Sequence, residues 1–218
     1  MRMTGIPLPS SARILFQSLE GVNKKISHGK YLYPLAPPGH PPYHPDMDKY
    51  YWSYEDIHET VRDLATMVKA SGFETDVIVA IGSGGFIPAR ILRTYIKKPI
   101  LAVGVAYYDV DDQPTETPRT LQWIEEAERK LAGKNILLVD EVDDSRVTLE
   151  YCVRELLRHG PAEVAVAVLH NKDKEKQGAL PEEVRHYFAG RTLDDLWIVY
   201  PWDATDIRAH YEAAREER

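Results

Sequence analysis

The chain has 218 residues and a formal net charge of -7. This length accommodates one well-buried domain, and the acidic balance disfavours nucleic acid or an anionic membrane as the main partner. The single cysteine, Cys152, excludes an internal disulfide framework, and no apolar run approaches the roughly 20 residues of a membrane-spanning helix, so we infer a cytoplasmic protein.

Residues 1–46 differ in composition from the rest of the chain. Prolines crowd positions 34–45 and predict loop or polyproline II conformation, because proline lacks a backbone donor and restricts its predecessor. We expect a poorly ordered extension over residues 1–46, although the basic, acid-free start faintly resembles a transit peptide. We expect His40 and His44 to be solvated rather than metal ligands. One domain is expected over residues 47–218.

A glycine-rich turn follows the first predicted strand. A helix is predicted from Ser53 to about Gly72, a buried strand over residues 77–81 and a helix over residues 86–96. The Gly-Ser-Gly-Gly turn at residues 82–85 lets backbone amides approach an anion at the positive end of the second helix. The turn lacks the dinucleotide and P-loop fingerprints. It therefore indicates a phosphate site, and a tight turn without a ligand remains the alternative.

A polar segment separates the next two predicted strands. Residues 100–106 predict a strand, residues 107–120 a long polar loop, and residues 121–131 a short helix. A polar loop near an active site is often a lid, and a solvated surface loop is the alternative. A calcium loop is rejected because Pro114 stands where the EF-hand pattern needs glycine.

The densest acidic motif follows a second buried strand. Apolar residues 136–139 predict a strand of a parallel sheet, and four acids follow it at Asp140, Glu141, Asp143 and Asp144. In open α/β sheets, ligands bind at the carboxyl ends of the strands. The Ser-Arg-Val-Thr turn at residues 145–148 begins a helix and suits a phosphate. We interpret Asp143 as a solvated spacer.

The last third of the chain completes the predicted sheet. Residues 164–170 predict a buried strand, residues 197–203 a short strand, and the C-terminus an amphipathic helix. Cys152 lies on the intervening helix, where we expect a buried small hydrophobe rather than a catalytic thiol. The order of elements predicts an α/β domain with a mostly parallel sheet flanked by helices.

The motifs together suit a ligand with two phosphate groups and a diol between them, and phosphoribosyl pyrophosphate (PRPP) has that shape. Residues 139–148 resemble the signature of type I phosphoribosyltransferases, and residues 81–90 resemble the pyrophosphate loop of the purine salvage branch. Residues 169–172 and 197–203 resemble its base-contacting strand and its purine-stacking segment. The chain from about residue 47 is therefore similar to the fungal type of hypoxanthine-guanine and xanthine phosphoribosyltransferases.

The resemblance implies a Rossmann-like fold with a small hood, a PRPP- and Mg²⁺-dependent transfer to a 6-oxopurine, and a homodimer. It also implies that the peptide entering the pyrophosphate loop, between Gly82 and Ser83, can be cis. Many relatives carry Lys or Arg where Ser83 stands, so one charge on pyrophosphate is missing, and Arg146 replaces a glycine. By this resemblance, Asp140 and Glu141 bind the ribose hydroxyls, Asp144 handles the proton at purine N7, and the 5-phosphate is bound by Ser145, Arg146, Val147 and Thr148. Pyrophosphate is bound by Ser83, Gly84 and Gly85, and the base by Lys172, Trp197 and Ile198. A second magnesium is bound by Asp203, and Asp140 and Glu141 have indirect metal roles.

For some single residues, a structural role without a ligand is the alternative, and for the whole chain there is an alternative function. Trp197 and Trp202 at a strand end fit core packing, and Lys172 in a Lys/Asp-rich turn fits a solvated side chain. The alternative function is a non-catalytic regulator that senses PRPP on the same fold. Such proteins usually add a DNA-binding module or a basic surface, which the acidic net charge disfavours.

Overall fold

A computed structural model describes residues 48–108 and 114–216. The predicted extension over residues 1–46 and its boundary with the domain lie outside the described residues, as do His40 and His44. None of the helices in these two ranges is long and apolar enough to cross a membrane.

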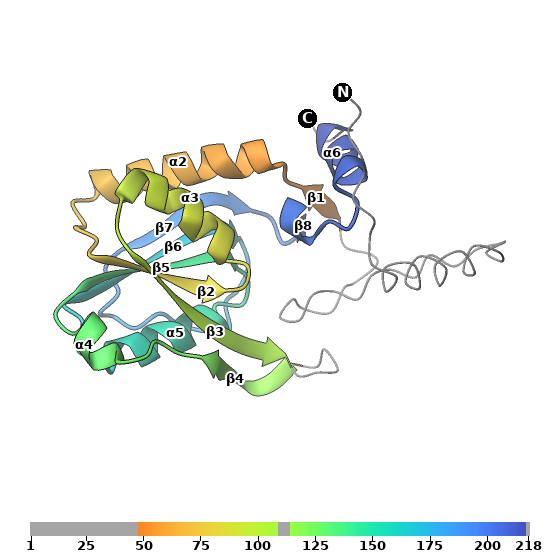
Figure 1. Ribbon diagram of the computed structural model, residues 1–218. Helices are drawn as coiled ribbons and strands as arrows, with labels where there is room; N and C mark the ends of the chain where they lie inside the picture. The colour runs from red at the N-terminus through yellow and green to blue at the C-terminus, as the bar shows by residue number, and fades with distance from the viewer. Residues whose placement is uncertain (1–47, 109–113, 217–218) are drawn as a thin grey trace, which may run out of the picture. The chain divides into compact units, whose positions relative to one another are not determined.

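A six-stranded sheet forms the centre of the domain (Figure 1). The strand order is β4-β3-β2-β5-β6-β7, and every neighbouring pair is parallel except the antiparallel pair β3 and β4. The strands are β2 (Val77–Gly82), β3 (Ile100–Tyr108), β4 (Pro114–Gln122), β5 (Asn135–Asp143), β6 (Glu163–Lys172) and β7 (Tyr187–Leu193). The predicted α/β class with a mostly parallel sheet is confirmed.

Helices cover both faces of this sheet. Helices α2 (Tyr54–Ala70) and α3 (Phe86–Ile96) lie on one face, and α4 (Ala127–Leu131) and α5 (Val147–Leu157) lie on the other (Figure 1). The β5 side chains alternate between two hydrophobic cores, one on each face of the sheet. Leu137 packs in the first core, beneath α2 and α3, and Leu138 packs in the second, beneath α4 and α5. Cys152 is fully buried in the second core, as predicted. Burial of β5 on both faces explains its unbroken apolar run.

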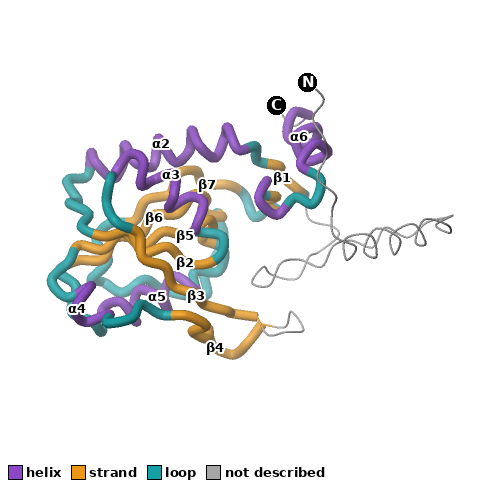
Figure 2. The backbone as a smooth tube through the Cα atoms, viewed as in Figure 1, coloured by secondary structure: helices purple, strands orange, loops and turns teal. Residues whose placement is uncertain are grey.

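A second, smaller sheet stands beside the carboxyl ends of the main strands. Strand β1 (Lys49–Tyr51) pairs in parallel with β8 (Trp197–Val199), followed by the 3-10 helix η1 (Pro201–Asp203) and α6 (Ile207–Glu216) (Figure 2). The amide of Trp197 donates to the Asp48 carbonyl at 2.8 Å, and the amide of Trp52 donates to the Val199 carbonyl at 3.1 Å. The predicted strand over residues 197–203 is thus a strand of three residues that turns into η1.

Two edge strands differ from the sequence prediction. The region predicted as a polar loop and a longer helix forms β4, and only Ala127–Leu131 is helical. Among the described strands, β4 pairs only with β3, and prolines are tolerated on such an edge because one side of the strand needs no ladder bonds. Residues 109–113 lie outside the described residues, so closure of a lid stays a prediction. Strand β7, the other edge, was not predicted.

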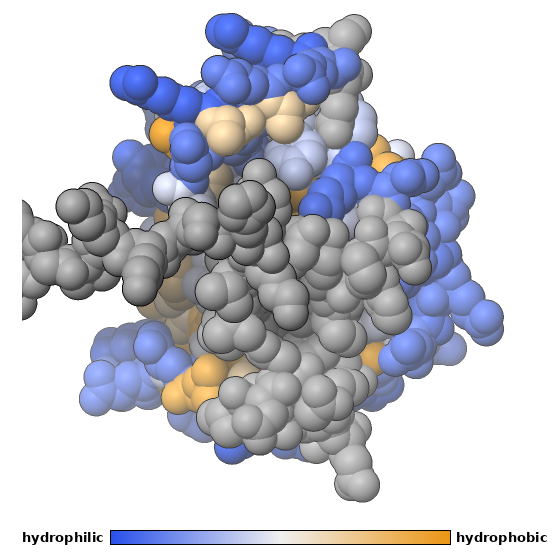
Figure 3. All heavy atoms as spheres, turned by 90° about the vertical axis from the view of Figure 1, so that its right-hand side faces the viewer, coloured by the Kyte–Doolittle hydropathy of each residue, from blue (hydrophilic) through white to orange (hydrophobic). Residues whose placement is uncertain are grey.

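Large exposed apolar side chains are scattered over the described surface. They come from separate elements, and where Figure 3 shows described atoms, small apolar patches lie among hydrophilic ones. These side chains are Tyr54, Met67, Phe86, Leu121 and Ile207.

Candidate functional site

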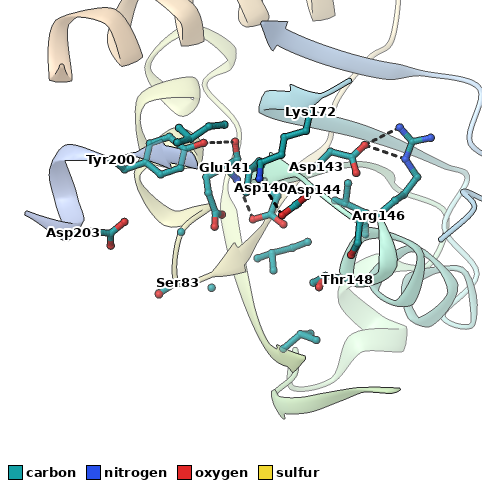
Figure 4. A pocket seen from close by; sticks show the side chains of 18 of the residues that line it. Ser83, Asp140, Glu141, Asp143, Asp144, Arg146, Thr148, Lys172, Tyr200 and Asp203 are labelled. Carbon is teal, nitrogen blue, oxygen red and sulfur yellow. Dashed lines mark hydrogen bonds and ion pairs between the residues drawn. The ribbon is translucent and has the colours of Figure 1, made fainter. Parts of the chain in front are cut away.

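A cavity of about 630 Å³ opens where β2, β5 and β6 end and the small sheet begins (Figure 4). Of the site residues that the sequence predicts, Gly85 and Val147 do not line it. Those that do are Ser83, Gly84, Asp140, Glu141, Asp144, Ser145, Arg146, Thr148, Lys172, Trp197, Ile198 and Asp203. The structure therefore gathers residues that are separated by up to 120 positions in the sequence, from Ser83 to Asp203.

The glycine turn is packed tightly between two strands. The peptide bond between Gly82 and Ser83 is cis, as the family resemblance implies. The Gly85 amide donates to the Ile81 carbonyl at 3.0 Å, and a Cβ on Gly85 would lie 2.6 Å from that same oxygen. Gly85 is therefore needed for packing, and its amide is already used within the turn. Its predicted part in pyrophosphate binding stays a prediction.

Gly84 faces the acidic strand end directly. A Cβ at this position would lie 2.0 to 2.3 Å from the carboxyl group of Glu141. Glycine thus leaves the space in which the Glu141 side chain lies. The Oε2 atom of Glu141 is buried and has no hydrogen-bond partner within the described part of the chain. An unpaired buried carboxylate oxygen is costly, so this atom is a natural acceptor for a ligand hydroxyl or a metal-bound water.

Asp140 lies deeper than Glu141 at the same strand end. Its side chain accepts the Glu141 amide at 3.0 Å. Burial raises the pKa of Asp140 well above its usual range, and the neighbouring charge of Glu141 raises it further. The free protein therefore favours a proton on Asp140, and positive charge brought by a ligand or ion favours release of that proton.

The last of the four acids, Asp144, is bound by two lysines. The Lys174 ammonium lies 2.6 Å from Asp144 Oδ1, and the Lys172 ammonium lies 3.3 Å from Oδ2. Both lysines also approach Asp195, at 3.0 Å and 3.5 Å. Burial lowers the pKa of Lys174, but its hydrogen bonds to Asp144 and Asp195 outweigh burial and raise it. Lys172 is buried rather than solvated.

Lys174 lines the cavity but was not predicted from the sequence. The available signal was its spacing of two from Lys172, which places the two side chains on one side of an extended segment.

The interpretation of Asp143 as a solvated spacer is wrong. Its side chain is fully buried and accepts hydrogen bonds from Arg146 Nε at 3.0 Å and from the Tyr187 hydroxyl at 2.7 Å. A buried carboxylate needs such partners. Because β5 continues through Asp143, this side chain points into the domain rather than into solvent.

Tyr200 connects the small sheet to the acidic strand end. Its hydroxyl donates to the Glu141 carbonyl at 3.1 Å and lies 2.8 Å from Nδ1 of His170. Since the tyrosine proton goes to Glu141, Nδ1 of His170 donates to the tyrosine oxygen. Burial lowers the pKa of His170 to about 3, so this histidine is neutral. Trp202 stacks on Tyr200 at 4.4 Å between ring centroids, which agrees with a packing role for that tryptophan.

The protein supplies only a partial set of metal ligands. Within the described ranges, no three His, Cys, Asp or Glu side chains converge closely enough to hold an ion. Asp203 lines the same cavity as Asp140 and Glu141, where the unpaired Glu141 oxygen lies. Magnesium usually takes one or two carboxylates and completes its shell with water and substrate phosphates. The donor set therefore fits a magnesium ion that binds together with a phosphorylated substrate.

The whole cavity lies within one recognised family match. The model of the "Phosphoribosyl transferase domain" matches residues 53–205, which include every predicted site residue. The chain belongs to this family. The resemblance inferred from the four sequence motifs is thereby confirmed.

Known members and solved structures extend this relationship. Hypoxanthine-guanine phosphoribosyltransferase of Schizosaccharomyces pombe is 42% identical over 194 residues, which cover 76% of this chain and 94% of that protein. Xanthine phosphoribosyltransferase 1 of Saccharomyces cerevisiae is 36% identical over 205 residues, or 79% of this chain and 98% of that protein. A crystal structure of a hypothetical protein from Neisseria gonorrhoeae with bound ppGpp has a TM-score of 0.75 and 48% identity, and covers 80% of this chain and 100% of that chain.

Proposed function

We propose that the chain is a purine salvage phosphoribosyltransferase, a pentosyltransferase. It transfers the 5-phosphoribosyl group of PRPP to N9 of a 6-oxopurine, which is hypoxanthine, guanine or xanthine, and releases pyrophosphate. One observation carries this proposal: a single cavity holds the acid pair, the glycine turn, the phosphate turn, and a lysine and a tryptophan suited to a base. The names of the fungal relatives support the same chemistry.

The PRPP half of the cavity is assigned to β2 and β5. Asp140 and Glu141 accept the ribose 2- and 3-hydroxyls, since a diol suits two carboxylate acceptors. The turn over residues 145–148 holds the 5-phosphate at the N-terminus of α5. Ser83 and Gly84 hold pyrophosphate with backbone amides. Ser83 supplies no charge there, so the positive charge that neutralises the pyrophosphate anion comes from another group.

The purine half is assigned to β6 and the small sheet. Lys172 donates to the exocyclic oxygen at C6, which disfavours adenine, and Trp197 stacks on the ring. The backbone of Ile198 reads the edge of the base. The pairing of β8 with β1 fixes the position of this segment, because Trp197 and Val199 are hydrogen-bonded to Asp48 and Trp52, the residues on either side of β1.

We propose the following role for each of these groups in the reaction. Asp140, Glu141 and Asp203 would hold a magnesium ion together with the substrate phosphates, and such an ion would supply Lewis-acid neutralisation of the leaving pyrophosphate. The C1–O bond breaks before N9 attacks, and the acid pair and the backbone amides stabilise the charges that develop. Asp144 lies beside purine N7 and manages its proton. A homodimer and a cytoplasmic location are part of the proposal.

A spectrophotometric assay tests the proposal. PRPP and magnesium are combined with hypoxanthine, guanine, xanthine or adenine, and pyrophosphate release is followed. We expect turnover with at least one oxopurine and little with adenine. Binding of PRPP without release of pyrophosphate in the presence of any of these bases would instead favour the non-catalytic regulator.

A second ligand is suggested by the Neisseria gonorrhoeae structure with bound ppGpp. This nucleotide combines guanine with diphosphates on the ribose, which are the groups that the two halves of the cavity are proposed to bind. We propose that ppGpp occupies this cavity and inhibits the transfer. Inhibition that PRPP relieves competitively would support this; an unchanged rate at saturating ppGpp would contradict it.

A further inference from the structure

A charged cluster, partly buried and centred on the fully buried Asp143, lies behind the phosphate turn. We name Asp143, Arg146, Lys176 and Tyr187 the loop clamp. The Asp143 carboxylate binds both Nε and Nη2 of Arg146, at 3.0 and 2.8 Å, as well as the Tyr187 hydroxyl. The Arg146 guanidinium also lies over the Tyr187 ring, 5.1 Å from its centroid. Figure 4 shows this guanidinium turned toward Asp143 and away from Thr148 and Ser83.

The clamp extends from side chains to the backbone of the turn. The Lys176 ammonium donates to the carbonyls of Asp143 and Asp144, at 2.8 and 2.9 Å. It also donates to the carbonyl of Lys172 at 2.7 Å and so joins the end of β6 to the end of β5. The amides of residues 177 and 178 both donate to the Ser145 carbonyl at 3.0 Å. Three successive carbonyls of the turn are thus held by the segment over residues 176–178.

The orientation of the carbonyls fixes the orientation of the amides. In a trans peptide the N–H points opposite to the C=O of the same unit. Among the described residues the cis bond is that between Gly82 and Ser83, so the peptides after Asp143, Asp144 and Ser145 are trans. Their N–H groups therefore face away from the segment over residues 176–178, and the residues that carry them, 144–146, line the cavity.

Two further observations concern the acceptor that this turn can bind and the rigidity of the turn. Arg146 is the N-cap of α5 and caps it with no side-chain hydrogen bond, so the first amides of the helix are left for another acceptor. The backing segment is in close contact, since a Cβ on Gly178 would lie 2.8 Å from the Arg146 carbonyl carbon and oxygen. The turn therefore has little freedom to rotate its carbonyls forward.

We propose that the loop clamp positions the amides of residues 144–146 for the 5-phosphate of PRPP. The Arg146 guanidinium acts through Asp143 and does not contact the phosphate. The clamp is thus a set of positioning residues, and this inference rests on the proposed function. It also gives the arginine at this position, where many relatives have glycine, a structural purpose.

A double-mutant cycle on PRPP affinity tests the proposal. Dissociation constants for PRPP with magnesium are measured by calorimetry for the full chain and for Asp143→Asn, Arg146→Met and the double variant. We expect each single change to weaken binding about tenfold and the double change to weaken it little further, because both remove one device. An equal loss from Arg146→Met in both backgrounds, with Asp143→Asn neutral, would show direct phosphate contact and overturn the proposal.

Milder and matched variants guard against loss of the fold. Tyr187→Phe removes one hydroxyl from the clamp and is expected to weaken PRPP binding about threefold with the KM for the base unchanged. Arg154→Met on the same helix removes an exposed arginine that pairs with Glu150, and Tyr151→Phe removes a hydroxyl bonded to Thr120. Both controls should change PRPP affinity by less than about twofold.

Amide hydrogen exchange separates the clamp from the proposed function. Without substrate, residues 144–148 should exchange faster in Asp143→Asn and Arg146→Met than in the unsubstituted chain, and no faster in the double variant than in either single variant. Unchanged exchange would overturn the clamp whatever the activity. If exchange is faster in the single variants but the unsubstituted chain neither binds PRPP nor releases pyrophosphate, the clamp would be supported and the proposed function contradicted.

Discussion

The ammonium of Lys174 lies 2.6 Å from Oδ1 of Asp144, and that of Lys172 lies 3.3 Å from the other oxygen. One carboxylate thus binds two cations in the absence of a base. If Lys172 is to donate to the purine oxygen, it must loosen its hold on Asp144. Lys174 can then keep that carboxylate paired, because it also has Asp195 as a partner.

Lys174→Met should therefore raise the KM for the purine. Without Lys174, Asp144 retains Lys172 more strongly, and the base must compete for that lysine. We expect a KM roughly three- to tenfold higher, as for a partly buried charge pair, with a smaller change in PRPP affinity. Steady-state kinetics with the preferred oxopurine measure it, and Lys69→Met at the end of α2 is the control. An unaltered KM would show that Lys172 needs no such release.

Asp144→Asn should lower turnover far more than it weakens PRPP binding. The amide keeps the shape of the side chain but cannot hold a negative charge or accept the purine proton. General acid–base catalysis typically contributes about a hundredfold or more, so kcat should fall by at least that factor. Comparison of kcat with a calorimetric PRPP dissociation constant separates the two effects. Near-normal turnover would remove Asp144 from the mechanism.

Trp197→Ala should raise the KM for the base, whereas Trp197→Phe should change it much less. Loss of aromatic stacking costs on the order of 1 kcal/mol, which corresponds to a KM about five- to tenfold higher. Phenylalanine retains a ring and serves as the matched control. Equal KM values for all three proteins would assign Trp197 to packing of the cavity wall instead.

The sequence was sufficient to predict those parts of the site in which functional residues directly follow a recognisable apolar strand. The apolar run of β5 ends at Asp140, and the glycine turn follows β2, so the residue pattern alone places both features at one sheet edge. Edge strands were harder. Strand β4 contains Pro114 and Pro118 and has the composition of a loop, because a strand with one neighbour tolerates residues that a central strand rejects.

Contacts between residues far apart in the chain were the other feature that the sequence could not predict. Nothing local shows that Tyr187 reaches Asp143 from β7, or that the Tyr200 hydroxyl reaches the Glu141 carbonyl from 59 positions away. These contacts depend on strand order and register, which the sequence pattern does not specify. The interpretation of Asp143 failed partly for this reason, since its partner Tyr187 is recognisable only once β7 is in place, whereas Arg146, three residues on, was a local signal.

Asp140→Asn should stabilise the protein most at neutral and alkaline pH. Because burial raises the pKa of Asp140 above the unfolded value near 3.8, ionisation opposes folding as pH rises from that value through the folded pKa. Asparagine removes this penalty and keeps an acceptor for the Glu141 amide. The gain in Tm over the unsubstituted chain should grow as pH rises above about 4, the range in which the unfolded acid ionises, while PRPP affinity falls.

Asp63→Asn is the control of opposite sign. Hydrogen bonds from Arg191 and Arg62 lower the pKa of Asp63, so its stabilising effect is present at neutral pH and lost as pH falls through that lowered pKa. This variant should lose stability at neutral pH and approach the unsubstituted chain in acid. Parallel Tm profiles for Asp140→Asn and the unsubstituted chain would contradict a raised pKa for Asp140.

Gly84→Ala and Gly85→Ala should fail in different ways, although they are neighbours in one turn. A Cβ on Gly84 meets the flexible end of Glu141, so the fold should persist while displacement of that carboxylate lowers PRPP affinity by roughly tenfold. A Cβ on Gly85 meets the backbone carbonyls of Ile81 and Val139, which cannot retreat, so the free energy of unfolding should fall by about 1–3 kcal/mol. Gly104→Ala, whose nearest contact would be 3.4 Å, is the control. If both turn variants lost stability equally while PRPP affinity per folded molecule stayed intact, the contact between Gly84 and Glu141 would have no part in binding. The acid pair would then not depend on the glycine turn for its position.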